Sequence, residues 1–238
     1  MQKYIPNILT SFNLLLGWSS VYFAFQGNIH TAIILILLAS FFDYLDGFVA
    51  RKLNAQSEIG AQLDSFADLI TFGVAPAVIV FYVSSLSLLF VEKQMEYWLF
   101  LILGFIPLLG AIRLARFNTF KHESPFFIGL PIPAFALITI SLTWTYIEYS
   151  SLMINIANYQ FFFPFTIFLI SFLMVSKWKF LSLKVKNLNF KQNKLIYLWL
   201  ILSIICFTFL IIFGNTFLIL PIVLFLYLLF SLINNFMS

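Results

Sequence analysis

The sequence predicts an all-α integral membrane protein, and three observations lead to this fold class. Hydrophobic residues make up 62% of the 238 residues and charged residues only 9%, with a mean hydropathy of +1.02. A soluble domain carries about 25% charged residues, so this composition suits lipid better than water. The apolar residues also come in runs of about 20, the length of a helix that crosses a bilayer. Finally, most Lys and Arg residues lie between these runs and on one side of the predicted membrane.

Eight apolar runs are expected to form helices that span the membrane. In chain order they cover residues 8–26, 30–51, 61–83, 95–116, 129–149, 160–177, 195–213 and 216–235. Little more than Gly214-Asn215 separates the last two, which predicts a tight helical hairpin. We therefore expect a six-helix transmembrane domain in residues 1–180, then a basic loop and a two-helix hairpin in residues 181–238. The first run follows Lys3 without a small-residue cleavage site, so we expect it to remain as the first span.

The basic residues predict which side of the membrane each loop faces. Cytoplasmic loops are enriched in Lys and Arg. With the N-terminus inside, twelve of the thirteen Lys and Arg residues fall on the inner side, and only Lys93 falls outside. Both termini of this multi-pass cell-membrane protein are therefore expected in the cytoplasm. The same distribution accounts for the net charge of +4, so we expect contact with membrane lipids and no nucleic-acid partner.

All the aspartates of the chain lie in one stretch, near the inner ends of the second and third runs. They are Asp43, Asp46, Asp64 and Asp68. The link between the two runs is centred near residues 55–56, so an antiparallel hairpin places Asp46 level with Asp64, and Asp43 level with Asp68. A charged side chain costs about 2.5–3.5 kcal/mol at the centre of an inserted helix, and four carboxylates also repel one another.

Metal binding explains this concentration of acidic residues. Carboxylate oxygens suit Mg²⁺, Mn²⁺ or Ca²⁺, and four aspartates are enough for two ions about 3.5–4 Å apart, the arrangement used in phosphoryl displacement. Gly47, Ala50 and Gly60 reduce the bulk beside the acids and leave room for a ligand. A polar helix contact and a cation channel or transporter are the alternatives. A channel predicts acids along its whole path, whereas these gather at one end.

The spacing of this stretch resembles a known signature. Residues 43–68, DYLDGFVARKLNAQSEIGAQLDSFAD, follow the pattern D-x2-D-G-x2-A-R-x8-G-x3-D-x3-D. This pattern resembles the signature of the CDP-alcohol phosphatidyltransferase family, and every fixed position matches. The six-helix arrangement also resembles the core of that family, and the last two predicted helices lie beyond it.

The resemblance implies a role for each matched residue. The first three aspartates would ligate metal, and Asp68 would be a ligand, the general base, or both. The other matched residues would surround the CDP portion of the donor; they are Gly47, Ala50, Arg51 and Gly60. The implied cofactor is Mg²⁺ or Mn²⁺, as two ions, and a homodimer is the implied assembly.

Two further stretches resemble the phosphatidylserine synthase branch of the family, which joins CDP-diacylglycerol to L-serine and releases CMP. AIRLARFN carries Arg113 and Arg116 at the inner end of the fourth run, followed by Asn118, and GLPIPA opens the fifth. The forked guanidinium group binds two oxygens, so Arg113 or Arg116 would hold the serine carboxylate or the donor diphosphate. We place Asn118 with them at the acceptor. Positive-inside anchoring is the alternative for the arginines.

The N-terminal stretch IPNILT resembles a segment near the donor pocket of relatives. Asn7 and Thr10 are therefore expected to contact CDP, with an ordinary helix start as the alternative. His30 and His122 have no identifiable ligand partner, so a zinc site is not expected. The expected function is a metal-dependent phosphatidylserine synthase of phospholipid biosynthesis, with its active site facing the cytoplasm. A phosphatidylglycerophosphate or phosphatidylinositol-type synthase is the alternative within the family.

Overall fold

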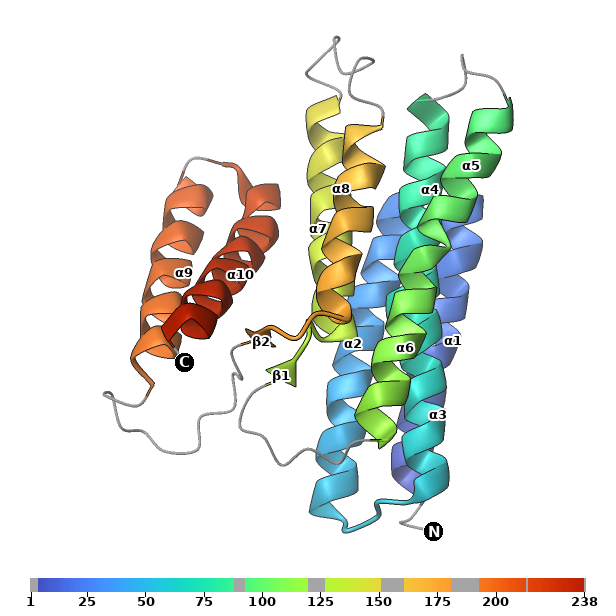
Figure 1. Ribbon diagram of the computed structural model, residues 1–238, viewed down its shortest axis with the longest axis vertical. Coiled ribbons are helices and arrows are strands. Elements are labelled where there is room, and N and C mark those ends of the chain that lie inside the picture. Colours follow the sequence, from blue (N-terminus) through green and yellow to red (C-terminus); the bar gives the residue numbers. More distant parts are fainter. Residues whose placement is uncertain are drawn as a thin grey trace.

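The computed structural model describes residues 4–87, 93–119, 127–150, 161–180, 193–212 and 214–237, and they are almost entirely helical (Figure 1). The helices follow the predicted apolar runs closely. In order they are α1 (Ile5–Phe25), α2 (Ile29–Lys52), α3 (Glu58–Asp68), η2 (Leu69–Val74), α4 (Ala75–Ser87), α5 (Lys93–Leu103), α6 (Phe105–Thr119), α7 (Ile132–Ser150), α8 (Phe162–Ser171), η4 (Phe172–Met174), α9 (Lys194–Ile212), η5 (Thr216–Leu218) and α10 (Ile219–Met237).

The lengths of these helices support a membrane protein. Among the described residues, the segments long and apolar enough to cross a membrane are Ile5–Phe25, Ile29–Lys52, Glu58–Leu86, Gln94–Thr119 and Lys194–Ile212. Three shorter apolar helices cover Ile132–Glu148, Phe162–Met174 and Ile219–Asn235. Of these three, Phe162–Met174 has far fewer than the roughly 20 residues that a span needs, and the count of eight spans stays a prediction.

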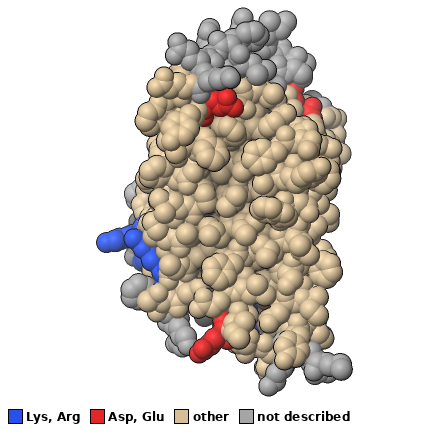
Figure 2. Space-filling view, turned by 90° about the vertical axis from the view of Figure 1, so that its right-hand side faces the viewer, with Lys and Arg blue, Asp and Glu red and all other residues tan. Residues whose placement is uncertain are grey.

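The outer surface of the bundle is suited to lipid. On the face drawn in Figure 2, the described acidic side chains lie near the two ends and the described basic side chains lie at one margin, with a broad uncharged surface between them. Large apolar side chains such as Phe12, Trp18 and Phe41 are about half exposed or more. The orientation of the chain in the membrane stays a prediction, because several lysines used for it lie outside the described residues: Lys3, Lys121, Lys184, Lys186 and Lys191. His122 lies outside them as well.

The third apolar run is one continuous segment that changes its winding just after Asp68. Here α3 passes into the π-helix η2 and then into α4. The Oγ1 of Thr71 in η2 donates a hydrogen bond to the carbonyl oxygen of Asn13 in α1, at 3.1 Å. Gly17 permits this approach, since a Cβ at that position would lie 2.7 Å from the Cα of Thr71. Single π turns inside α-helices are frequent at functional sites.

The fourth apolar run is interrupted, although it was predicted as one helix over residues 95–116. The interruption falls at Gly104, between α5 and α6. Pro107 accounts for it, because proline has no N–H for the carbonyl of Leu103, four residues earlier, and its ring crowds that turn.

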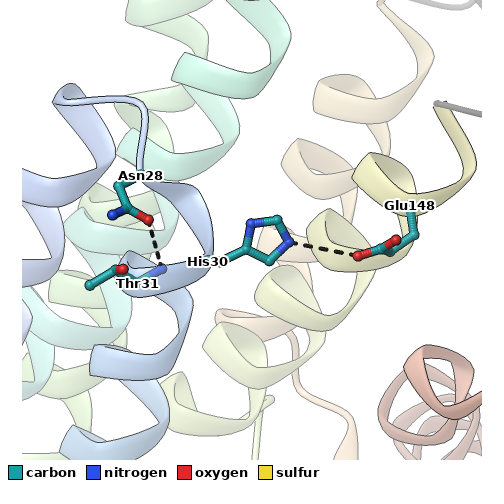
Figure 3. A network of polar contacts seen from close by, with 4 residues as sticks. All are labelled: Asn28, His30, Thr31 and Glu148. Carbon is teal, nitrogen blue, oxygen red and sulfur yellow. Dashed lines mark hydrogen bonds and ion pairs between the residues drawn. The ribbon is translucent and has the colours of Figure 1, made fainter.

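At the end of the bundle away from the aspartates, Asn28 caps α2, and His30 of α2 meets Glu148 of α7 (Figure 3). The Oδ1 of Asn28 accepts a hydrogen bond from the backbone N–H of Thr31 at 3.3 Å and caps α2. The Nε2 of His30 lies 3.7 Å from Glu148 Oε1, and its ring packs edge-on against Trp144. These contacts assign His30 to helix packing at the outer end.

The C-terminal hairpin of α9 and α10 lies beside the bundle (Figure 1). Two short strands, β1 (Phe127–Ile128) and β2 (Lys179–Phe180), pair antiparallel at its base. The backbone N–H of Lys179 donates to Asn235 Oδ1 at 3.2 Å, which ties β2 to α10. Within the hairpin, Trp199 Nε1 donates to the carbonyl oxygen of Val223 at 3.2 Å. The hairpin is therefore attached to the bundle through β2, and α10 also contacts α7.

Candidate active site

The turn between α2 and α3 sets the geometry of the site. The chain leaves α2 through a backbone hydrogen bond from Ala55 N–H to the carbonyl oxygen of Ala50, at 3.0 Å. Asn54 then adopts a positive φ of 49°, which asparagine tolerates better than most residues. Ser57 caps α3 by accepting the N–H of Gly60 at 3.0 Å. The chain thus reverses within a few residues, and the two acidic ends lie side by side.

Three of the four aspartates converge between α2 and α3. Asp43, Asp64 and Asp68 each offer a carboxylate oxygen, and these oxygens all lie within 4.8 Å of one another. The carboxyl groups of Asp43 and Asp68 lie next to each other and interact directly. The Oδ1 atoms of Asp64 and Asp68 are buried and have no partner among the described residues. Buried oxygens without a donor, in an all-carboxylate set, fit a hard divalent cation.

Asp46 lies beside this cluster and has a different partner. Its Oδ2 accepts a hydrogen bond from Thr10 Oγ1 at 2.6 Å, and both side chains are buried. The guanidinium group of Arg51, on the same helix, interacts with it electrostatically. The structure therefore brings Asp46 next to the other three aspartates, but outside the group of three whose oxygens lie within 4.8 Å of one another.

The two glycines of the motif have different surroundings. A Cβ on Gly60 would lie 2.9 Å from both Asn7 Oδ1 and Ser57 Oγ, so this glycine lets α3 approach Asn7 on α1. A Cβ on Gly47 would first meet the mobile guanidinium end of Arg51, at 3.4 Å. A Cβ on Gly60 would therefore crowd the Asn7 amide and the Ser57 cap, whereas a Cβ on Gly47 would meet only the end of Arg51. Ala50 lies one turn beyond Gly47 and is half-buried.

The three residues assigned to the acceptor separate into two kinds. Arg113 interacts electrostatically with Asp68, and its Nε is buried with no hydrogen-bond partner among the described residues. Arg116 is exposed and donates from Nη1 to the carbonyl oxygen of Val175 at 3.3 Å. Asn118 is also exposed and donates to Ser65 Oγ at 2.9 Å. Arg113 is thus the buried arginine that interacts with Asp68, while the other two residues bond α6 to Val175 and to Ser65.

The structure adds residues that sequence reasoning missed. Tyr227 on α10 is only 6% exposed, is hydrogen bonded to Ser231, and interacts electrostatically with Arg113. No local signal in the sequence could have found it, because it lies more than a hundred residues after Arg113. Asn13 is completely buried on α1, one turn after Thr10. Here a signal existed, since an amide inside an apolar run is uncommon and usually has a partner.

Comparison with known proteins agrees with this geometry. The model of a family described as CDP-alcohol phosphatidyltransferase matches residues 3–233. The chain is 36% identical over 178 residues to CDP-diacylglycerol–serine O-phosphatidyltransferase of Bacillus subtilis, which covers 75% of this chain and 90% of that protein. It is 33% identical over 197 residues to the protein of the same name from Helicobacter pylori, covering 82% of this chain and 79% of the relative. It is 38% identical over 158 residues to archaetidylserine synthase of Methanothermobacter thermautotrophicus, covering 64% of each.

Proposed function

The chain belongs to the CDP-alcohol phosphatidyltransferase family, and we propose that it transfers the phosphatidyl group of CDP-diacylglycerol to the hydroxyl of L-serine in phospholipid biosynthesis, with release of CMP. The observation that carries this proposal is the convergence of Asp43, Asp64 and Asp68 within the family's motif, with Arg113 beside them. The bacterial and archaeal relatives compared above are all named for serine, which supports serine as the acceptor.

The acidic cluster is the proposed site of Mg²⁺ or Mn²⁺. Asp43, Asp64 and Asp68 would hold one ion, and Asp46 would join them for a second. Divalent ions at this position would offset the charge of the donor diphosphate and of the departing CMP. The buried oxygens of Asp64 and Asp68 that lack a donor are the structural support for this assignment.

Asp68 is proposed as the general base. A serine hydroxyl is a weak nucleophile until its proton is removed, and a carboxylate within hydrogen-bond reach can accept that proton. The serine oxygen then forms a bond to the lipid-side phosphorus of the donor. The bond from that phosphorus to the oxygen bridging to CMP breaks, and CMP leaves with the electron pair. This in-line displacement requires no covalent intermediate with the protein.

The remaining motif residues are proposed to bind the substrates. Gly47, Ala50, Arg51 and Gly60, with Asn7 and Thr10, would surround CDP, and Arg113 would hold the serine carboxylate. Arg116 and Asn118 would support the acceptor site from its edge through Val175 and Ser65. With eight spans and both termini in the cytoplasm, the site would open to the cytoplasm, where soluble serine meets the lipid donor at the membrane edge. A homodimer is the proposed assembly.

A direct assay tests this function. Purified protein in detergent or nanodiscs is incubated with CDP-diacylglycerol, Mn²⁺ and one acceptor at a time: serine, glycerol 3-phosphate or inositol. We expect CMP release with serine as the acceptor, and none with glycerol 3-phosphate or inositol. Release only with another acceptor would refute serine while retaining the reaction class. No release with any acceptor, together with Mn²⁺ flux through liposomes containing the protein, would favour a cation channel instead.

A further inference from the structure

Asn13 is a buried residue of α1 whose side-chain amide has no partner. It is 0% exposed, and neither Oδ1 nor Nδ2 forms a hydrogen bond with any residue that the structure describes. Nearly all buried polar atoms in proteins are paired. The hydrocarbon region of a membrane offers no bulk water to those that are not. An amide buried here is therefore expected to have a partner in the working protein.

A contact on α2 fixes the depth of Asn13 in the bundle. One turn before it, Thr10 Oγ1 donates to Asp46 Oδ2 at 2.6 Å. Helices α1 and α2 are antiparallel neighbours, so a step of three residues forward on α1 matches a step of three residues back on α2 (Figure 1). That step leads from Thr10 to Asn13 on one helix and from Asp46 to Asp43 on the other.

A contact on η2 gives the same depth from the other side. The carbonyl oxygen of Asn13 accepts a hydrogen bond from Thr71 Oγ1, and Thr71 follows Asp68 by three residues. Thr71 also lies against Gly17, which shares a helix face with Asn13, since a Cβ on Gly17 would be 2.7 Å from the Cα of Thr71. Helix α1 and the α3–η2 segment run in the same direction, so a step of about one turn back leads from Gly17 to Asn13 on one and from Thr71 to Asp68 on the other. The buried amide thus lies in the interface of α1 with α2 and η2, at the level of Asp43 and Asp68.

We propose that Asn13 positions Asp68, by donating a hydrogen bond from Nδ2 to Asp68 Oδ1 directly or through one bound water. Asn13 Nδ2 is a buried donor without an acceptor, and Asp68 Oδ1 is a buried acceptor without a donor. The two atoms belong to residues at the same level of the bundle. This inference rests on the proposed function, in which Asp68 is the base.

Three variants and one control test the proposal. Asn13→Ala removes the amide, and Asn13→Asp keeps its shape while replacing the donor with a further carboxylate. Asn13→Ser keeps a smaller donor and serves if the alanine variant does not fold. Ser20→Ala is the matched control, because Ser20 is equally buried on α1 but donates at 2.8 Å to the carbonyl oxygen of Ala32, away from the aspartates. Each protein is assayed for CMP release, Mn²⁺ affinity by calorimetry, and thermal unfolding.

The expected result separates turnover from binding. Loss of a residue that orients a catalytic group typically lowers activity by about 10- to 100-fold, and we expect this fall in kcat for Asn13→Ala. We expect a larger fall for Asn13→Asp, a smaller one for Asn13→Ser, and an unchanged serine KM for Asn13→Ala. Because Asp68 is also a proposed metal ligand, we expect Asn13→Ala to lower Mn²⁺ affinity as well, by no more than about 100-fold. An unchanged kcat would overturn the proposal. So would a fall in Tm with normal kcat per folded molecule, which would make Asn13 purely structural. Absence of serine-dependent CMP release from the unsubstituted protein would refute the proposed function itself, before any variant is compared.

Discussion

Thr10 Oγ1 lies 2.6 Å from Asp46 Oδ2 and joins α1 to the acidic motif on α2. The same hydroxyl also lies 3.0 Å from the carbonyl oxygen of Pro6, one turn earlier on its own helix. Both side chains are buried, so the hydroxyl is the donor that satisfies one oxygen of a carboxylate removed from water. The N-terminal helix therefore contacts the acidic motif directly.

Replacing Thr10 with valine tests this contact. Valine keeps the shape but leaves a buried carboxylate oxygen without its donor, which costs about 1–3 kcal/mol. We expect Thr10→Val to lower the thermal unfolding temperature and the rate of CMP release, and Thr10→Ser to restore both. Thr208→Val is the control, because Thr208 is exposed on α9 and donates only to carbonyl oxygens of its own helix. Equal effects of Thr10→Val and Thr208→Val would contradict a specific role for the bond to Asp46.

Gly47→Ala tests whether this glycine leaves room for the donor nucleotide. The added methyl group would meet only the flexible guanidinium end of Arg51, at 3.4 Å, so the protein is expected to fold normally. If CDP occupies this space, the same methyl group raises the KM for CDP-diacylglycerol. Steady-state kinetics at varied donor concentration measure the effect. A normal donor KM in a folded variant would remove Gly47 from the proposed CDP site.

Gly17→Ala is the contrasting substitution, because its effect is expected on stability. The new Cβ would lie 2.7 Å from the Cα of Thr71, so α1 and η2 must separate. Inserting a methyl group into a close-packed contact typically costs about 1–3 kcal/mol. We expect a lower unfolding temperature for Gly17→Ala than for Gly47→Ala. Equal unfolding temperatures of the two variants would mean that α1 and η2 can separate to admit the methyl group without loss of stability.

The hairpin that carries the aspartates was predictable because local rules determine it. Two apolar runs joined by a short polar link form an antiparallel pair, and the spacing of Asp43 and Asp68 from that link places them at one depth. The π-helix η2 was not predictable, since the contacts of Thr71 with Asn13 and Gly17 come from another helix. The break at Gly104 could have been predicted from Pro107, but the continuous apolar run favoured a single helix.

The residues predicted to bind the acceptor show that neighbours in sequence need not share a role. Arg113, Arg116 and Asn118 lie within six positions of sequence, yet Arg113 is buried and interacts with Asp68, whereas Arg116 and Asn118 are exposed and bond Val175 and Ser65. Their surroundings depend on the packing of α6 against η2 and η4, and no pattern within AIRLARFN expresses it. The electrostatic interaction of Tyr227 with Arg113 likewise depends on the docking of α10, which lies more than a hundred residues after Arg113 in the sequence.

Removal of divalent metal is expected to abolish CMP release and to lower stability. A ligand that binds only the folded protein stabilises it by about 2.7 kcal/mol at a concentration 100 times its Kd. We expect Mn²⁺ to raise the unfolding temperature of chelator-treated protein, and Asp64→Asn to lose this response. Glu58→Gln is the control, because Glu58 is an exposed acid at the start of the same helix. A full response of Asp64→Asn to Mn²⁺ would place the ion elsewhere.

Asp68→Asn is expected to stop turnover without unfolding the protein. The amide keeps the size of the side chain but cannot accept the serine proton, and a general base contributes about 10²- to 10⁴-fold to a rate. We expect CMP release to fall by at least about 100-fold while the gel-filtration profile and the helical circular dichroism are retained. Normal turnover by this variant would exclude Asp68 as the base.

Arg113 and Arg116 are expected to differ in their effects on serine binding. Hydrogen bonds to charged groups contribute about 1.5–3 kcal/mol, so loss of a fork that holds the serine carboxylate raises the serine KM by about 10- to 100-fold. We expect this for Arg113→Gln, and a smaller rise for Arg113→Lys, which keeps the charge but not the fork. Arg116→Gln loses a bond from an exposed side chain to the carbonyl oxygen of Val175, so we expect a small loss of stability and an unchanged serine KM. The KM values for serine and for CDP-diacylglycerol are measured in parallel for each variant. A rise in the donor KM alone for Arg113→Gln would move Arg113 to the diphosphate, and a rise in the serine KM only for Arg116→Gln would reverse the assignment of the two arginines.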